Sequence, residues 1–126
     1  MTIKKSSILI MMLVFLMTAC TSSSYQKITA KEARELLLSD SSVILLDVRT
    51  EAENKELRIP GSLLIPLDTL STKAQTLLLD KQAKIVIYCR SGNRSKQAAD
   101  ILIDLGYTNV FDMGGIIDWP YETESN

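Results

Sequence analysis

The sequence predicts an α/β fold in which a small, mostly parallel sheet is flanked by helices. Short apolar runs alternate along the chain with segments whose apolar residues recur at helical spacing, and this alternation is typical of parallel sheets. The clearest strand, residues 85–88, ends directly before a loop that leads into a helix. The length of 126 residues allows one small domain.

The first half of the domain is predicted to form a helix and two strands. Residues 29–32 (Thr-Ala-Lys-Glu) fit a helix-capping box, and the apolar residues after them share one face of a helix that ends near residue 40. Residues 43–47 are apolar up to Asp47, as expected of a strand that is buried on both faces. A second, shorter strand is expected over residues 63–65.

The second half is predicted to contain two helices around the central strand. Leucines and one alanine recur at helical spacing over residues 67–78, so this segment is expected to cover the sheet. After the central strand comes a helix from about Asn93, which Gly106 stops. The last strand is short, residues 109–111, and the glycine pair 114–115 is expected to turn the chain after it.

Residues 1–19 have the pattern of a secretory signal. Two lysines precede an unbroken apolar run over residues 8–17, which is about half the length that a membrane-spanning helix needs. A short membrane anchor or a buried helix is the alternative. Residues 17–20 (Met-Thr-Ala-Cys) resemble a bacterial lipobox, with Met17 where leucine is commonest, and this resemblance implies that Cys20 is lipidated.

These patterns divide the chain into four segments. A lipoprotein signal peptide over 1–19 is followed by the lipidated amino terminus and a serine-rich tether over 20–27, a folded domain over 28–122 and a carboxyl-terminal tail over 123–126. We therefore expect an exported protein that acyl chains anchor to a membrane and that faces the periplasm or the cell exterior.

The composition excludes several classes of function. With 14 Lys and Arg against 15 Asp and Glu, the formal charge is −1, and the chain has no basic run with aromatic residues, so a nucleic-acid partner is not expected. The absence of histidine excludes Ser-His-Asp, Cys-His and histidine-rich metal sites within the chain. We expect no metal or other cofactor, and chemistry that rests on Cys, Asp, Glu, Lys, Arg, Tyr or Ser.

Cys89 is the candidate nucleophile, because it is the sole thiol once the first cysteine is lipidated. It lies at the carboxyl end of the central strand, where ligands bind in α/β sheets, in the loop Tyr-Cys-Arg-Ser-Gly-Asn-Arg-Ser over residues 88–95. Inward-turned N–H groups around Gly92, the positive end of the following helix dipole, and the charges of Arg90 and Arg94 all favour a thiolate. The alternative is an inert, buried cysteine.

Four motifs, in the right order, resemble those of the rhodanese family. They are Asp-Val-Arg at 47–49, Arg-Ile-Pro-Gly-Ser at 58–62, Cys-Arg-Ser-Gly-Asn-Arg-Ser at 89–95, and a closing Gly-Tyr at 106–107 with Met-Gly-Gly at 113–115 and Trp119. The resemblance covers residues 28 to about 121. Asn54, Leu57 and Arg58 stand where family members often have an aromatic residue and a Gly-His pair, and Asn54 indicates a locally looser connection.

The resemblance implies a sulfurtransferase with a two-step mechanism. The Cys89 thiolate attacks the outer sulfur of a small anionic donor such as thiosulfate, sulfite leaves, and a persulfide remains that backbone N–H groups stabilise. Cyanide or a thiol then accepts the sulfur. The four residues between Cys89 and Arg94 match the loop of sulfurtransferases, whereas related phosphatases and arsenate reductases have five and a wider cradle.

The resemblance also implies roles within the active loop. The persulfide-binding loop comprises Arg90, Ser91, Gly92, Asn93, Arg94 and Ser95. Arg90 and Arg94 are expected to attract the donor, and the alternative for Arg94 is an ion pair with a carboxylate such as Asp47. Ser91 or Ser95 is expected to donate a hydrogen bond to sulfur or to cap the helix, and for Ser95 the cap is favoured.

Three residues outside the loop are expected to support it. Asp47 and Arg49 are expected to hold the loop architecture rather than touch substrate. Trp119 is expected to form part of the core or the pocket wall.

A module without this catalytic role is the rival hypothesis. A rhodanese-like domain that binds a partner at the cell envelope, or that senses oxidation through Cys89, also fits a lone cysteine in an exported chain. The intact loop favours catalysis over pure binding, and no particular protein partner is implied.

Overall fold

Five parallel strands form a single sheet in the order β1-β5-β4-β2-β3. This computed structural model describes residues 24–126, so the predicted signal peptide, Cys20 and the first residues of the tether lie outside the described residues. The strands are β1 (Gln26–Lys27), β2 (Ile44–Asp47), β3 (Leu63–Leu64), β4 (Lys84–Cys89) and β5 (Asn109–Gly115). The predicted α/β class with a parallel sheet and the central position of β4 are confirmed.

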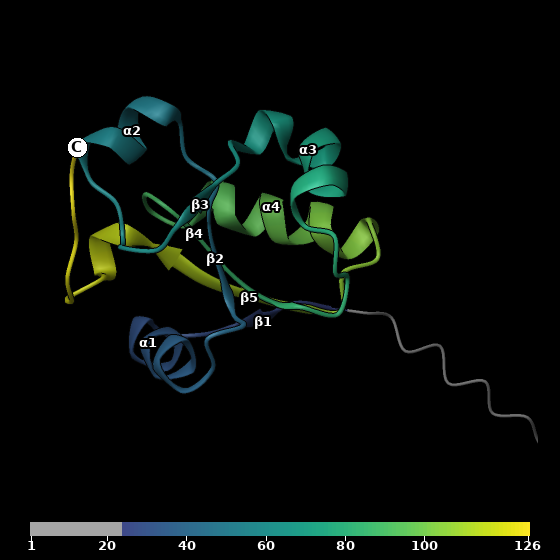
Figure 1. Cartoon of the computed structure of the whole chain (residues 1–126), viewed down its shortest axis with the longest axis horizontal. Helices are drawn as coiled ribbons and strands as arrows, with labels where there is room; N and C mark the ends of the chain where they lie inside the picture. The colour runs from purple at the N-terminus through teal and green to yellow at the C-terminus, as the bar shows by residue number, and fades with distance from the viewer. Residues whose placement is uncertain (1–23) are drawn as a thin grey trace, which may run out of the picture.

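Helices cover both faces of the sheet. They are α1 (Ala30–Ser39), α2 (Glu51–Glu56), the 3-10 turn η2 (Leu67–Thr69), α3 (Leu70–Leu77), α4 (Asn93–Asp104) and the 3-10 turn η3 (Ile116–Asp118). Figure 1 shows α1 on one face, α3 and α4 on the other, and α2 beside the carboxyl ends of the strands. No helix among residues 24–126 is long and apolar enough to cross a membrane.

The central strand β4 contributes to both layers of core. Ile85, Ile87 and Cys89 face the cluster beneath α3 and α4, whereas Val86 and Tyr88 face the cluster beneath α1. These five side chains are at most 1% exposed. Because burial of one such apolar side chain stabilises the fold by about 1.5–3 kcal/mol, β4 anchors the sheet and holds Cys89 rigidly at its end.

The start of α1 and the end of α4 lie where the sequence predicts them. Thr29 caps α1 by accepting a hydrogen bond from the Glu32 N–H at 3.1 Å. Gly106, at a φ of +95°, ends α4, where its N–H donates to the Ile103 carbonyl and that of Tyr107 to the Leu102 carbonyl.

Three features of the fold differ from the sequence prediction. Gln26 and Lys27, assigned to the tether, pair with β5. Helix α2 was not predicted, because its six residues are polar and too few to show a helical period. The glycine pair 114–115 lies within β5, where an irregularity in the pairing with β4 absorbs it, and the chain turns only at η3.

The carboxyl-terminal tail is docked on the domain. Glu124 pairs with Arg58 in an antiparallel bridge, and the Asn126 N–H donates to the Lys55 carbonyl at 3.0 Å. The tail therefore binds the segment that contains α2. Figure 1 shows the carboxyl terminus beside this helix.

Candidate active site

Cys89 is the last residue of β4 and lies directly ahead of α4. Gly92 turns the loop between them with a φ of +109°, a conformation that favours glycine. The turn brings the Gly92 N–H to 3.0 Å from the Cys89 Sγ, to which it donates. The loop geometry therefore directs backbone donors at the sulfur, as the sequence predicts.

The surroundings of Cys89 favour its thiolate. Burial raises the pKa of this thiol, which is 1% exposed, but hydrogen bonds from the backbone and hydroxyl of Ser95 and from the N–H groups of Gly92 and Ser91 lower it more. The net pKa of Cys89 lies below the ordinary value of a thiol. A buried cysteine with these donors differs from an inert core residue, because its charged form is the one the site stabilises.

Ser95 does not occupy the N-cap position of α4. The N-cap is Gly92, which makes no side-chain cap bond. Ser95 is fully buried in the first turn, where its hydroxyl donates to the Gly92 carbonyl at 3.1 Å and also contributes to the lowered pKa of Cys89. The predicted cap is thus wrong, since the loop residue with positive φ occupies that position. The alternative role, support of the sulfur, is favoured by the contribution of Ser95 to the lowered pKa of Cys89.

Arg94 is engaged in an ion pair. Its two terminal nitrogens donate to the carboxylate oxygens of Glu53 at 2.7 and 2.9 Å. Arg94 lowers the pKa of Glu53 to about 2, assisted by hydrogen bonds from Thr50. The ion-pair alternative therefore describes Arg94, but its partner comes from α2 and not from Asp47. Glu53 was not predicted as a site residue, because its only local signal is the Thr50–Glu53 capping box.

Asp47 and Arg49 form a buried support behind the loop. Arg49 donates from Nε to Oδ1 of Asp47 at 2.9 Å and from Nη2 to Oδ2 at 2.7 Å, and the two side chains are 4% and 0% exposed. Tyr88 Oη and Asn54 Nδ2 donate to the same carboxylate at 3.1 and 3.0 Å. Asn54 thus connects α2 to the core through a hydrogen bond. The looser connection predicted there is wrong, because the Asn54 amide makes this bond where an aromatic side chain would have packed.

The other two departures from the family pattern make different contacts. Arg58 donates hydrogen bonds to Glu124 at 3.0 Å and to Asn126 at 2.6 Å. Leu57 lines a cleft of about 230 Å³ at the loop, and its carbonyl accepts from Arg49 at 2.7 Å. Of the three departures, only Leu57 lines this cleft.

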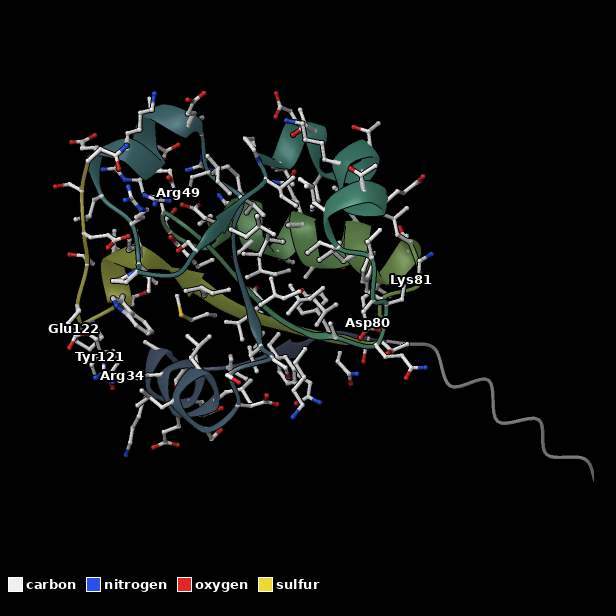
Figure 2. All side chains as sticks on the ribbon, in the orientation of Figure 1. Arg34, Arg49, Asp80, Lys81, Tyr121 and Glu122 are labelled. Atoms are coloured by element: carbon white, nitrogen blue, oxygen red, sulfur yellow. The ribbon has the colours of Figure 1, made fainter. Side chains whose placement is uncertain are left out.

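That cleft opens beside Arg90, the exposed neighbour of Cys89. It is lined by Arg49, Glu53, Glu56, Leu57, Arg90, Ile116 and Ile117. Figure 2 shows Arg49 beside α2, which forms one side of this region. Among residues 24–126 no three His, Cys, Asp or Glu side chains are placed to hold a metal ion together.

Gly115 is a site residue that the sequence analysis missed. A Cβ on it would meet the Arg90 carbonyl oxygen and would lie 2.7 Å from the Ser91 Cα. The Ile117 N–H also donates to the Arg90 carbonyl at 3.3 Å. The end of β5 therefore contacts the active loop directly. The glycine pair 114–115 was the only signal of this contact in the sequence.

The remaining predicted residues do not contact the sulfur through their side chains. Ser91 and Asn93 are exposed, and Ser91 acts through its N–H. Trp119 is half-buried against the core beneath α1, and it lines a separate pocket with residues such as Arg34 and Glu122. Figure 2 shows Arg34, Tyr121 and Glu122 together at that place, away from Arg49.

Comparison with known proteins identifies the family. Residues 29–120 match the rhodanese-like domain. A sulfurtransferase of Allochromatium vinosum is 36% identical over 94 residues, covering 74% of this chain and 86% of that protein. The thiosulfate sulfurtransferase PspE of Escherichia coli is 34% identical over 73 residues, covering 58% of this chain and 70% of PspE.

The crystal structure of a rhodanese-related protein from Thermoplasma volcanium matches with a TM-score of 0.70 at 30% identity, over 81% of this chain and 100% of that one. The motifs, the fold and these similarities together place the chain in the rhodanese-like domain family.

Proposed function

We propose that this protein is a sulfurtransferase that carries a sulfane sulfur on Cys89 as a persulfide. The observation that carries the proposal is the lowered pKa of a buried thiol on which N–H donors of a strand-to-helix loop converge. The same donors suit a persulfide, whose outer sulfur is an anion at neutral pH. The names of the relatives from A. vinosum and E. coli support transfer of sulfur in general.

The first half-reaction moves sulfur from donor to enzyme. With thiosulfate, the Cys89 thiolate attacks the outer sulfur, the Sγ–S bond forms, and the S–S bond of the donor breaks. The electron pair of that bond leaves with sulfite, and the charge of the thiolate passes to the outer persulfide sulfur. In the second half-reaction a thiol or cyanide takes this sulfur and regenerates the thiolate. Ping-pong kinetics follow, because one product leaves before the acceptor reacts.

Mass spectrometry of the Cys89→Ser variant tests this mechanism. After incubation with thiosulfate, the peptide with Cys89 is expected to gain one sulfur that cyanide removes, and the serine variant is expected to gain none. Circular dichroism establishes that both proteins are folded. Turnover that persists in Cys89→Ser would show that sulfur does not pass through this thiol.

Thiol redox sensing is the second candidate, because a thiolate is also the form that oxidants attack. Reaction with hydrogen peroxide followed by trapping of the sulfenic acid separates the two functions. A sensor is expected to give a sulfenic acid or a mixed disulfide at low peroxide and no persulfide turnover. A sulfurtransferase is expected to turn over sulfane sulfur many times per thiol.

We also propose that the protein is anchored to a membrane through Cys20 and faces the periplasm or the cell exterior. The support is the lipobox-like sequence Met-Thr-Ala-Cys after an apolar run with two preceding lysines. Replacement of Cys20 by alanine is expected to move the protein from the membrane fraction, where detergent is needed to extract it, to the soluble fraction. Retention of Cys20→Ala in the membrane fraction would contradict lipid anchoring.

A further inference from the structure

The charges in and next to the cleft beside Arg90, the neighbour of Cys89, are nearly balanced. Arg49 is bound by Asp47 at 2.7 Å, and Arg94 is bound by Glu53 at 2.7 Å. Among residues 24–126, Arg90 forms no ion pair, and the carboxylate of Glu56 lines the same cleft without an ion-pair partner. A donor that enters the cleft therefore meets one uncompensated cation and one uncompensated anion.

This balance disfavours a donor with two negative charges. Thiosulfate is a dianion, and the thiolate it must approach is itself negative. The backbone N–H donors at the sulfur and the charge of Arg90 oppose the Coulomb repulsion between these charges, whereas the carboxylates of Asp47 and Glu53 offset much of the charge of the other two arginines. A donor with a single negative charge meets less repulsion from the same thiolate.

The wall of the cleft is apolar where a donor's body would lie. Leu57 is 42% exposed and Ile117 is 64% exposed, so both present large apolar side chains to solvent. Ile116 belongs to the same lining. Burial of such surface by an apolar group on the donor is favourable by about 25 cal/mol per Å².

We propose that this protein takes sulfur from singly charged donors that carry an apolar group in preference to dianionic thiosulfate, and that Glu53 sets this preference by neutralising Arg94. The inference rests on the proposed function and names the class of donor. The organic thiosulfonates, R–SO2–S⁻, represent that class. The Sγ–S bond to Cys89 forms, the S–S bond of the donor breaks, and its electron pair leaves with the sulfinate R–SO2⁻, so no oxidant or reductant is needed.

Single-turnover persulfide formation with three donors tests the preference. Thiosulfate, methanethiosulfonate and benzenethiosulfonate are each mixed with the full-length protein, and mass spectrometry follows the gain of one sulfur. Each rate constant is divided by that of the same donor with a small free thiol, which removes differences in intrinsic reactivity. We expect the normalised rate to rise about tenfold from thiosulfate to methanethiosulfonate, and to rise again with the benzene ring.

The donor comparison separates two kinds of failure. A normalised rate for thiosulfate that equals or exceeds those of both thiosulfonates overturns the inference and leaves the sulfurtransferase proposal standing. Absence of the persulfide with every donor overturns the sulfurtransferase proposal itself.

The Glu53→Gln variant tests the role assigned to Glu53. Glutamine keeps the capping box with Thr50, since either side chain serves at that position, and it still accepts a hydrogen bond from Arg94. Only the negative charge is lost. We expect the normalised rate with thiosulfate to rise several-fold and to fall more steeply with added salt, while the rate with methanethiosulfonate changes less.

Glu51→Gln is the matched control. Glu51 lies on the same helix, loses the same charge, and pairs with Lys55 on the exposed surface outside the cleft. We expect its donor ranking to equal that of the unchanged protein. Equal effects of the two variants would show that net charge, and not the Glu53–Arg94 pair, sets the preference. Should Glu53→Gln unfold, the donor ranking of the unchanged protein still tests the charge preference.

Discussion

At the scale of the residue, the reactivity of Cys89 depends on hydrogen bonds more than on formal charge. From the sequence, Arg90 and Arg94 are expected to favour the thiolate. In the structure Arg94 is bound to Glu53, and the groups that lower the pKa of Cys89 are the N–H groups of the loop and Ser95. Backbone donors achieve this because the loop holds them in place without the entropy cost of a long side chain.

Replacement of Ser95 by alanine tests the role of its buried hydroxyl. Loss of its hydroxyl removes one of the hydrogen bonds that lower the pKa of Cys89, so the pKa is expected to rise and the thiolate fraction at neutral pH to fall. The rate of alkylation by iodoacetamide as a function of pH measures the shift. We expect the profile to move to higher pH, with a several-fold lower rate at pH 7.

Ser91→Ala is the control for this prediction. Ser91 is exposed and acts on the sulfur through its N–H, which alanine retains. An alkylation profile of Ser91→Ala that matches the unchanged protein, beside a shifted profile for Ser95→Ala, assigns the effect to the buried hydroxyl. Identical profiles for all three proteins would show that this hydroxyl does not act on the thiolate.

At the scale of the element, α2 is held to the active loop by one ion pair. Hydrogen bonds from Arg94 hold the pKa of Glu53 at about 2, against an ordinary value of 4.5. A lowered pKa in the folded state means that the pair stabilises the fold fully above about pH 4.5. That contribution is lost as the pH falls from 4.5 to 2, because Glu53 becomes protonated.

Thermal unfolding as a function of pH checks this dependence. We expect the unchanged protein to have a higher Tm than Glu53→Gln at pH 6, and the difference to shrink between pH 4.5 and pH 2. The same comparison with Glu51→Gln is expected to give a smaller difference at pH 6, since its pair with Lys55 is exposed. A difference for Glu53→Gln that stays constant down to pH 2 would contradict the ion pair.

The end of β5 is the second element that shapes the loop. Alanine at Gly115 is expected to push on the Arg90 carbonyl and the Ser91 backbone, with a cost of about 1–3 kcal/mol and a larger loss of persulfide formation. Gly114→Ala is the comparison, because Gly114 has a φ of +87° and an added Cβ there meets nothing within 4 Å. Urea unfolding and single-turnover rates are measured on both. If Gly115→Ala and Gly114→Ala lose equal stability and equal rates of persulfide formation, the contact between Gly115 and the loop is not the cause of the lost rate.

Which elements could be predicted depends on whether their signal is local. The strand β4 is predictable because its residues Ile85 to Tyr88 are continuously apolar, and α4 because apolar residues recur before a glycine stop. The strand β1 consists of two exposed residues, and its only cause is pairing with β5. The partner of Arg94 was missed for the same reason, since Glu53 lies 41 residues earlier and only the fold brings it near.

At the scale of the whole molecule, the carboxyl ends of the strands and the chain's own terminus meet at the same place. The loops after β2, β4 and β5 supply Arg49, Arg90 and Ile117 to one cleft. Such convergence at the strand ends follows from a parallel sheet, and for this reason the position of the site could be predicted from the chain. The involvement of the tail could not, because residues 123–126 carry no apolar pattern.

The docked tail predicts a coupling between the carboxyl terminus and the site. Deletion of residues 123–126 removes the bonds from Arg58 to Glu124 and Asn126, and from the Asn126 N–H to the Lys55 carbonyl. Because these bonds hold the end of α2, hydrogen exchange is expected to rise in residues 51–58 and to stay unchanged in α1 and α4. Glu53 lies in the same segment, so a looser α2 is also expected to weaken its hold on Arg94 and to raise the thiosulfate rate as Glu53→Gln does. Exchange that rises evenly across the domain would show that the tail stabilises the fold as a whole instead of α2.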